Sequence, residues 1–597
     1  MKRLTTGILI VLIAASSITR AGVTHLKAEC RKGKTYVTFT QTPEGKLYRV
    51  YRSTEKIRAV ADMKPVATLD DTSSREPHHG WQHIISDKGQ PLDKKTGLFV
   101  YTPKKDEQAY YAVTVDDHEN IAPGVNALAE PVAETQLEWP GAVLREIKKD
   151  RRGLVHVFYY WMDHADWNHA AEYYGHYFVV WVPETLKGKA GNPLITNLHS
   201  ASGASTPGAT GVELPRFRNA VSVATSDTYR RSPVKSYVGS TGWSGYTNNF
   251  KKHRPKQGDV VVGYTELRVV AYTHAVMADP RFGIDPNRVY LRGSSMGGMG
   301  TLFIGSHYPD LWASMRANVA PIFRGNSEPR DWGDVKKRWA SPGEWLRGAS
   351  LFGPRDLGLT LANGVRAYDW YSISWMARNR LDTDLPPLVH SHASKDWKRA
   401  MRLNRNLYRA FAETRRGVWG LWVDKGHGRH GHHAYGHAVV PGGFMRFLKN
   451  EMYPAFSNAS KDDDYGQKDQ DKRAFIGATG DKDPLKFDAA GVMNTYIDWT
   501  SKLHDMGLAD DDLVDAKDRI AITMKSGRPD TMADVTPHRV QNFVIEPGKA
   551  CPWKNVDVAT GKLVASGEVT ADKRGLITVR AFAISKTGNR LIVTLKK

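Results

Sequence analysis

The first part of the chain, from about residue 24 to residue 135, alternates apolar and polar side chains in short runs. Segments such as KTYVTFT, KLYRVYRS and AYYAVTV are separated by stretches rich in turn residues. A period of two is typical of strands that bury one face. The pattern predicts an all-β module over 24–135. Its last stretch, IAPGVNALAEPVAET, carries two prolines and small side chains and is expected to be a linker.

A different pattern covers residues 137–454. Short apolar runs such as NPLITNLHS, NAVSVATS, NRVYLRG and PPLVHSH alternate with segments of helical period, for example YTELRVVAYTHAVMAD. Strands that alternate with helices favour a mainly parallel sheet. We therefore predict an α/β domain over 137–454, with helices on both faces of its sheet.

The pattern changes again after residue 454. Residues 458–486, which include NASKDDDYGQKDQDKR, are rich in mixed charge and poor in apolar side chains, as expected of a solvated linker. Strand-like segments such as RIAITMK, RVQNFVIE and LITVRAFAI return over residues 487–597. They predict a second module, similar to a β-sandwich, at the end of the chain.

The first 21 residues have the composition of a secretory signal. A basic start, MKR, precedes the apolar run ILIVLIAA, and TRA offers a cleavage site. The run is shorter than the ~20 residues that span a bilayer, so export is favoured over stable membrane insertion. A buried N-terminal helix is the alternative. Export to the periplasm or the medium permits a disulfide between Cys30 and Cys551, but the sequence does not show whether they pair.

The formal net charge of +21 favours acidic partners. Export argues against nucleic acid, and the chain carries no recognisable nucleic-acid-binding motif. An acidic polysaccharide or an anionic surface remains, and colloidal solubility alone is the alternative explanation of the charge.

Candidate chemistry is concentrated in RVYLRGSSMGGMG, where glycines surround two adjacent serines. A Gly-x-Ser-x-Gly pattern between a strand and a helix is typical of a nucleophile elbow. Ser295 has Gly293 and Gly297 two residues away on either side, whereas Ser294 would have Arg292 and a methionine there. The tight turn leaves no room for side chains at the flanking positions. Ser295 is therefore the predicted nucleophile, and a glycine-rich packing turn is the alternative.

Around this motif, residues 137–454 resemble the α/β-hydrolase superfamily. DPNRVYLRGSSMGG is most similar to the secreted polyhydroxybutyrate depolymerase, feruloyl esterase and acetylxylan esterase group, and prolyl-oligopeptidase-type peptidases share the elbow. Residues 24–135 resemble a fibronectin type III module through YRVYRS and YYAVTVDDHEN. The resemblance implies the α/β-hydrolase fold and a serine mechanism that needs no cofactor.

A serine nucleophile needs a base and an orienting carboxylate, which follow it along the chain in this fold. The resemblance places the acid at Asp396, in the turn after PPLVHSH, where His392 and Ala393 take the first two positions of the family's H-G-x-x-D; alanine replaces the usual glycine. It places the base at His427, between two glycines. Rival candidates are Asp382, Asp384 and Asp424 for the acid and His430, His432 and His433 for the base.

The histidine cluster also raises the possibility of a metal site, but the sequence has no His-Glu-x-x-His motif, and we expect no metal. The oxyanion should be bound by the backbone N–H of Met296 and by that of Ser200 or Ala201, in the loop after the NPLITNLHS strand. Aromatic residues crowd residues 157–181. Their alternative roles are buried strand faces or sugar stacking, and the candidates for stacking are Trp161 and Trp167. Trp243, in a later glycine-rich loop, is a candidate for lining the substrate cleft.

Together these features predict an exported serine hydrolase whose β modules flank the catalytic domain. The expected substrates are acetyl or feruloyl esters of a polysaccharide. Polyester cleavage and prolyl-oligopeptidase-type peptide cleavage are alternatives, although the first 135 residues are too few for a propeller. A binding protein that has kept the fold without its chemistry is the remaining alternative.

Overall fold

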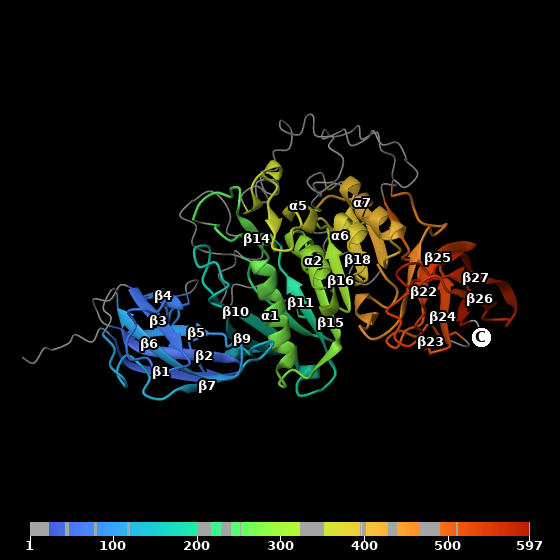
Figure 1. The fold of residues 1–597 in the computed structure, drawn as a ribbon. Helices are drawn as coiled ribbons and strands as arrows, with labels where there is room; N and C mark the ends of the chain where they lie inside the picture. The colour runs from blue at the N-terminus through green and yellow to red at the C-terminus, as the bar shows by residue number, and fades with distance from the viewer. Residues whose placement is uncertain are drawn as a thin grey trace, which may run out of the picture.

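The computed structural model describes residues 23–41, 47–76, 80–115, 120–200, 216–227, 240–250, 252–322, 351–394, 396, 401–427, 439–465, 490–508 and 512–595. The chain runs from an N-terminal β module through a central α/β part to a C-terminal β region, from blue to red in Figure 1. The predicted signal segment, 1–21, lies outside the described residues. None of the described helices is both long enough and apolar enough to cross a membrane.

The N-terminal module consists of two antiparallel sheets, with strand orders β1-β2-β5 and β4-β3-β6-β7. Inward side chains of both sheets, among them Val37, Val50, Phe99 and Val113, form one buried cluster. The strands are β1 (Val23–Arg31), β2 (Lys34–Gln41), β3 (Leu47–Ser53), β4 (Ala67–Asp70), β5 (Thr96–Tyr101), β6 (Glu107–Val115) and β7 (Val132–Glu134).

The central sheet has ten strands in the order β21-β19-β18-β16-β15-β11-β12-β10-β9-β8. The strands β12, β11, β15, β16, β18 and β19 pair parallel with one another, whereas the pairs β8–β9, β9–β10, β10–β12 and β19–β21 are antiparallel. Their bounds are β8 (Val143–Asp150), β9 (Gly153–Trp161), β10 (Gly175–Pro183), β11 (Asn192–Leu198), β12 (Val221–Ala224), β15 (Ile284–Ser294), β16 (Ser314–Asn318), β18 (Leu388–Ala393), β19 (Val418–Val423) and β21 (Gly491–Met493).

Within the described residues, five α-helices, four 3-10 helices and a small sheet, β13-β14-β17, connect these strands. The α-helices are α1 (Tyr264–Ala278), α2 (Met296–His307), α5 (Ala367–Trp370), α6 (Ile373–Asn379) and α7 (Met401–Glu413). The small strands are β13 (Tyr246–Thr247), β14 (Val260–Val262) and β17 (Thr360–Leu361), and the 3-10 helices are Glu184–Leu186, Pro309–Leu311, Arg355–Leu357 and Phe444–Arg446.

In the described part of the chain, the α-helices cover one face of the central sheet. On β11 and β15, Leu194 and Leu291 cluster with side chains of α1 and α2, and strand residues farther along cluster with α6 and α7. The neighbouring residues Ile195 and Tyr290 point to the opposite face and pack among side chains of the C-terminal region. Successive residues of a strand face opposite sides of a sheet, so the two clusters mark the two faces.

The prediction of helices on both faces is therefore corrected for the described residues. From β12 to β15, β16, β18 and β19, each new parallel strand is added in the same direction along the sheet. Right-handed crossovers that advance in one direction place their helices on one face. The second face is covered by β structure from both ends of the chain.

The C-terminal β region forms two sheets, β20-β25-β28 and β22-β24-β29-β26-β27, with β23 beside β24. Its boundary differs from the prediction at 454/487, because β20 pairs with β25 whereas β21 extends the central sheet beside β19. The strands are β20 (Tyr453–Ser457), β22 (Ile497–Trp499), β23 (Leu513–Asp515), β24 (Arg519–Ser526), β25 (Thr531–His538), β26 (Ala550–Asp557), β27 (Leu563–Thr570), β28 (Val579–Ile584) and β29 (Asn589–Thr594). Cys30 on β1 and Cys551 on β26 are free thiols in this structure.

Candidate active site

The two adjacent serines stand where β15 ends and α2 begins. Ser295 has φ 56° and ψ −120°, a backbone conformation that residues other than glycine rarely adopt. Its N–H donates to the carbonyl oxygen of Asn318 at the end of β16, over 2.9 Å. A strained serine between a strand and a helix presents its hydroxyl at the sheet edge, as in a nucleophile elbow.

The glycines of the motif are required by close approach of the backbone. A Cβ on Gly293 would lie 2.2 Å from the carbonyl oxygen of Gly297, and a Cβ on Gly297 would lie 2.1 Å from that of Leu198. Both distances are shorter than any side chain tolerates, so the turn fits only between glycines. The elbow thereby packs directly against the end of β11.

Three side chains from three strand ends meet at this point. The Nε2 atom of His427 lies 3.1 Å from Ser295 Oγ, and its Nδ1 atom lies 2.6 Å from Asp396 Oδ2. Ser295 follows β15, Asp396 follows β18 and His427 follows β19, so all three lie at the carboxyl edge of the parallel strands. The sequence-predicted catalytic residues are thus within hydrogen-bonding distance of one another.

Burial divides the roles within this group. Asp396 is 1% exposed and Ser295 is 4% exposed, whereas the side chain of His427 is 32% exposed. A buried carboxylate beside Nδ1 holds the imidazole in the tautomer that carries its proton on Nδ1, so that Nε2 can accept the proton of the serine hydroxyl. The imidazole itself remains open to solvent and to a substrate.

The rival acids are placed differently. Asp384 contacts His538 Nδ1 over 2.9 Å, at the junction with the C-terminal region. Asp382 has a side chain 75% exposed and lies 3.6 Å from Arg380. Asp424 lies 3.4 Å from the hydroxyl of Ser394. The rival bases, His430, His432 and His433, lie outside the described residues.

The second serine of the motif belongs to a hydrogen-bond chain across three strands. The amide of Asn318 on β16 donates to Ser294 Oγ over 3.3 Å, and Ser391 on β18 donates to Asn318 Oδ1 over 2.8 Å. The chain joins the strand that carries the elbow to the strand that precedes Asp396. Ser294 is thus engaged in tying the strands together, which separates its role from that of Ser295.

The predicted oxyanion donors lie on the two sides of the elbow. Met296 is the first residue of α2, and N–H groups of a first helical turn point out of the helix rather than to an intrahelical carbonyl. Ser200 follows β11, and its carbonyl oxygen lies 2.8 Å from His199 Nδ1. Ala201 lies outside the described residues.

Of the two interpretations of the aromatic residues, burial holds for Trp161 and Trp167, and the substrate-lining role of Trp243 needs correction. Trp161, Trp167 and Trp243 are 2%, 7% and 0% exposed. Trp161 packs against Tyr36 of the N-terminal module, and Trp167 packs against Tyr264 of α1. A ring enclosed by protein offers no surface to a sugar, so these three side chains are core residues.

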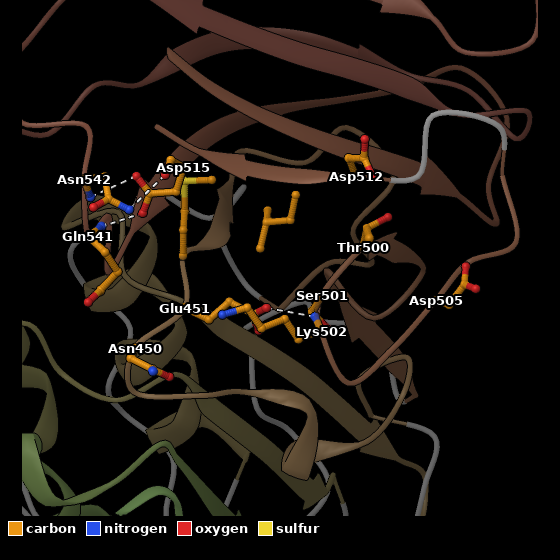
Figure 2. Close-up of a pocket in the computed structure, with 12 residues that line it drawn as sticks. Asn450, Glu451, Thr500, Ser501, Lys502, Asp505, Asp512, Asp515, Gln541 and Asn542 are labelled. Atoms are coloured by element: carbon orange, nitrogen blue, oxygen red, sulfur yellow. Dashed lines mark hydrogen bonds between the residues drawn. The ribbon is translucent and has the colours of Figure 1, made fainter. Parts of the chain in front are cut away.

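A pocket of about 410 Å³ lies elsewhere, in the C-terminal β region (Figure 2). Two of its acidic side chains, those of Asp515 and Glu451, accept hydrogen bonds from the backbone around it. Asp515 accepts from the main-chain N–H groups of Gln541 and Asn542, and Glu451 accepts from that of Lys502. Burial raises the pKa of Glu451. These carboxylates organise loops, and we assign the pocket no part in the candidate chemistry.

Sequence reasoning missed the residues that support the site. Asp227, Thr241 and Asn318 are buried polar side chains next to the elbow or to the loop after β11. The signal for Asp227 was a carboxylate directly after the apolar strand NAVSVATS, and that for Asn318 was a lone amide at a strand end. Neither signal specifies a partner, because the partners come from distant segments.

No family profile and no curated protein sequence matches the chain. Among solved structures, the chain is similar to an S-formylglutathione hydrolase from Agrobacterium tumefaciens, with 16% identity, 48% of this chain and 92% of that chain covered, and a TM-score of 0.32. It is similar to a ferulic acid esterase, with 14% identity, coverage of 47% and 94%, and a TM-score of 0.28. It is also similar to the acylaminoacyl peptidase of Pyrococcus horikoshii, with 14% identity, coverage of 68% and 59%, and a TM-score of 0.29. Likenesses this weak transfer no activity, so the case for an α/β-hydrolase fold is carried by the parallel sheet and by the elbow after β15.

Proposed function

We propose that this protein is a serine hydrolase that cleaves carboxylic esters through an acyl-enzyme. The observation that carries the proposal is the continuous contact from Asp396 to His427 to Ser295, over 2.6 Å and 3.1 Å. A serine hydroxyl is a weak nucleophile until a base takes its proton, and this arrangement supplies the base and its orienting carboxylate.

Each group has one role in the proposed mechanism. Ser295 Oγ attacks the ester carbonyl while its proton passes to Nε2 of His427, and the Asp396 carboxylate stabilises the imidazolium. The tetrahedral oxyanion collapses, the bond to the alcohol oxygen breaks, and Nε2 returns the proton to that alcohol. Water then attacks the acyl carbonyl while Nε2 of His427 takes its proton. The bond to Ser295 Oγ breaks and Nε2 returns the proton to that oxygen, which releases the acid and restores the hydroxyl.

The proposed substrate is an acetyl or feruloyl ester on an acidic or neutral polysaccharide outside the cell. The net charge of +21 supports an acidic polymer, and the flanking β structure supports a polymeric partner. We propose further that the N-terminal module is of the fibronectin type III kind. Its sheets of three and four strands, in the orders β1-β2-β5 and β4-β3-β6-β7, support that assignment.

The test of the chemistry is hydrolysis of nitrophenyl acetate by Ser295→Ala, which should lose at least about 10³-fold in kcat. Ser306→Ala is the matched control. Ser306 is a buried serine on α2, the helix that follows Ser295, and its hydroxyl donates to the carbonyl oxygen of Phe303 in the same helix. A fluorophosphonate should label Ser295 in the folded protein. Undiminished turnover by Ser295→Ala would overturn the proposal.

The substrate class is tested separately, by measuring acid release from acetylated xylan, methyl ferulate, polyester film and proline-containing peptides. Faster release of acetate or ferulate than of the other products supports the polysaccharide ester. Preferred release from the film or from the peptides would instead support a depolymerase or a peptidase with the same triad.

A further inference from the structure

Asp227 is a buried carboxylate beside the candidate site that the catalytic steps do not use. It follows β12 and is 0% exposed. Its hydrogen bonds come from one short loop: Ser240 Oγ and Trp243 N donate to Oδ2 over 2.7 Å and 3.1 Å, and the N–H and hydroxyl of Thr241 donate to Oδ1. Each carboxylate oxygen therefore accepts one hydroxyl and one main-chain N–H.

The same residue also fixes the loop after β11. The main-chain N–H of Asp227 donates to Nε2 of His199 over 2.9 Å, so Nε2 is the acceptor and the ring proton lies on Nδ1. From Nδ1, His199 donates to the carbonyl oxygen of Ser200 over 2.8 Å. The indole N–H of Trp243 donates to the carbonyl oxygen of His199 over 3.1 Å. Two consecutive carbonyls at the end of β11 are thus held in fixed directions.

These contacts extend to the helix that begins directly after the nucleophile. Ser240 Oγ lies 3.1 Å from the sulfur of Met296, the residue after Ser295. A Cβ on Gly300 of α2 would lie 2.3 Å from Trp243 Cβ, so the loop and the nucleophile helix are in direct contact. Asp227 therefore connects the loop after β11 to the first turn of α2, the two segments that border the nucleophile.

We propose that Asp227 is a positioning residue that sets His199 and Ser200, directly after β11, for stabilisation of the oxyanion. The inference rests on the proposed function, since an oxyanion forms only if Ser295 attacks a carbonyl. An oxyanion is stabilised by N–H donors held about 3 Å from the place where charge develops, and a small misplacement costs a large part of that stabilisation. The Asp227 carboxylate accepts four hydrogen bonds from Ser240, Thr241 and Trp243, and Trp243 in turn holds the carbonyl of His199, so the carboxylate acts on the end of β11 through Trp243.

The test is Asp227→Asn, which preserves shape but replaces one acceptor oxygen by an NH₂ group. In either orientation of the amide, that NH₂ faces a main-chain N–H, from Thr241 or from Trp243, and a main-chain donor cannot turn into an acceptor. We expect kcat on nitrophenyl acetate to fall about 10–100-fold with KM changed less than about threefold, because the ground state makes little use of the oxyanion contacts.

A second readout separates positioning from a merely structural role. Sulfur accepts hydrogen bonds weakly, so an intact oxyanion site favours nitrophenyl acetate over its thiono analogue, in which sulfur replaces the carbonyl oxygen. Asp227→Asn should lower this oxygen-to-sulfur ratio of kcat/KM. The matched control is Glu134→Gln, a buried carboxyl group of the N-terminal module that accepts from Thr35 Oγ1 over 2.8 Å. It should lower the melting temperature and leave the ratio unchanged.

If Asp227→Asn does not fold, Thr241→Val and Thr241→Ser carry the same test, because serine keeps the hydroxyl that valine removes. Valine should lower kcat and the oxygen-to-sulfur ratio, and serine should restore both to within about twofold of the wild type. An unchanged ratio in the folded variants would overturn the positioning role. Activity that survives in Ser295→Ala would overturn the proposed function instead, so the two failures are distinguishable.

Discussion

The N-terminal module and the C-terminal β region pack against opposite ends of one sheet, and they are attached to it by different kinds of contact. The N-terminal module packs its side chains on the sheet: Tyr36, Leu98 and Val100 share a cluster with Tyr159 and Trp161, and none of its described strands pairs with a strand of the central sheet. The C-terminal part of the chain adds a strand to the sheet, because β21 pairs with β19. The N-terminal module thus covers part of the central sheet, whereas the C-terminal part of the chain supplies its edge strand beside β19.

The two attachments also lie at unequal distances, counted in strands, from the candidate triad. β19, which carries the segment that ends at His427, lies between β18 and β21. Trp419 on β19 stacks on Trp499 of the C-terminal region, with ring centroids 5.1 Å apart. The N-terminal contacts involve β8 to β10, which β12 and β11 separate from the elbow strand. Disturbing the C-terminal attachment should therefore lower kcat as well as stability, and disturbing the N-terminal attachment should lower mainly stability.

The largest effect is expected from ending the chain at residue 465. This removes β21 and all partners of β20, exposes the edge of β19, and leaves the buried cluster around Trp419 without half of its members. An exposed edge and an opened core favour aggregation. We expect no soluble protein with a cooperative thermal transition by circular dichroism. A soluble, active chain of this length would show that the C-terminal region is an accessory.

A smaller effect is expected from starting the chain at residue 136, which removes the N-terminal module. The sheet keeps all its backbone pairs, but Tyr159, Trp161 and Tyr177 lose their cover. Burying apolar surface contributes about 25 cal/mol per Å², so the melting temperature should fall clearly. Below that temperature kcat on nitrophenyl acetate should remain within about threefold of the full chain. Loss of fluorophosphonate labelling in the folded protein would contradict this.

The sequence predicted the site better than it predicted these attachments. The position of Ser295 follows from a local signal, the glycine-flanked serine, whereas the choice of Asp396 and His427 over rivals such as Asp424 and His430 came from the resemblance to the α/β-hydrolase superfamily. Residues that follow neighbouring parallel strands lie at the same edge of the sheet, which is why the three predicted residues could approach one another.

The attachments depend on pairing between segments that are distant in the sequence. Nothing in GVM, the segment of β21, distinguishes a strand of the central sheet from a strand of the C-terminal region. The aromatic run around Trp161 was open to two interpretations, because a tryptophan on a strand can be covered by another module or can face a sugar. Burial decides between them, and burial is set by the N-terminal module packed about a hundred residues away.

One polar side chain at each attachment allows a matched comparison of their effects on stability and on kcat. At the C-terminal side, the buried amide of Asn494 donates to the carbonyls of Val418 and Phe456, over 3.0 Å and 3.1 Å. At the N-terminal side, Tyr174 OH accepts from the N–H of Val100 over 3.0 Å. Asn494→Ala should cost about 1–3 kcal/mol of unfolding free energy, and Tyr174→Phe about 1 kcal/mol. Only Asn494→Ala should also lower kcat. Equal effects of both variants on kcat would erase the distinction.

A further expected effect is a pH dependence of stability at the N-terminal attachment. Lys34 lies buried there, donates to Thr102 Oγ1 over 2.6 Å and faces the ring of Tyr160; burial lowers its pKa to about 7. Unfolded lysine has a pKa of about 10.4, so the unfolded chain binds more protons between about pH 7 and pH 10.

Stability should therefore rise with pH across that window, while below pH 7 the cost of burying the charged amine is fully present. From pH 7 to pH 9, wild type should gain roughly 1–2 kcal/mol of unfolding free energy in urea relative to Lys34→Met. Lys32→Met, which removes a half-exposed lysine 2.9 Å from Asp87, is the control and should show the wild-type gain. If Lys34→Met showed the wild-type gain as well, Lys34 would be neutral or charged in both states. The N-terminal attachment would then contribute no pH dependence of its own.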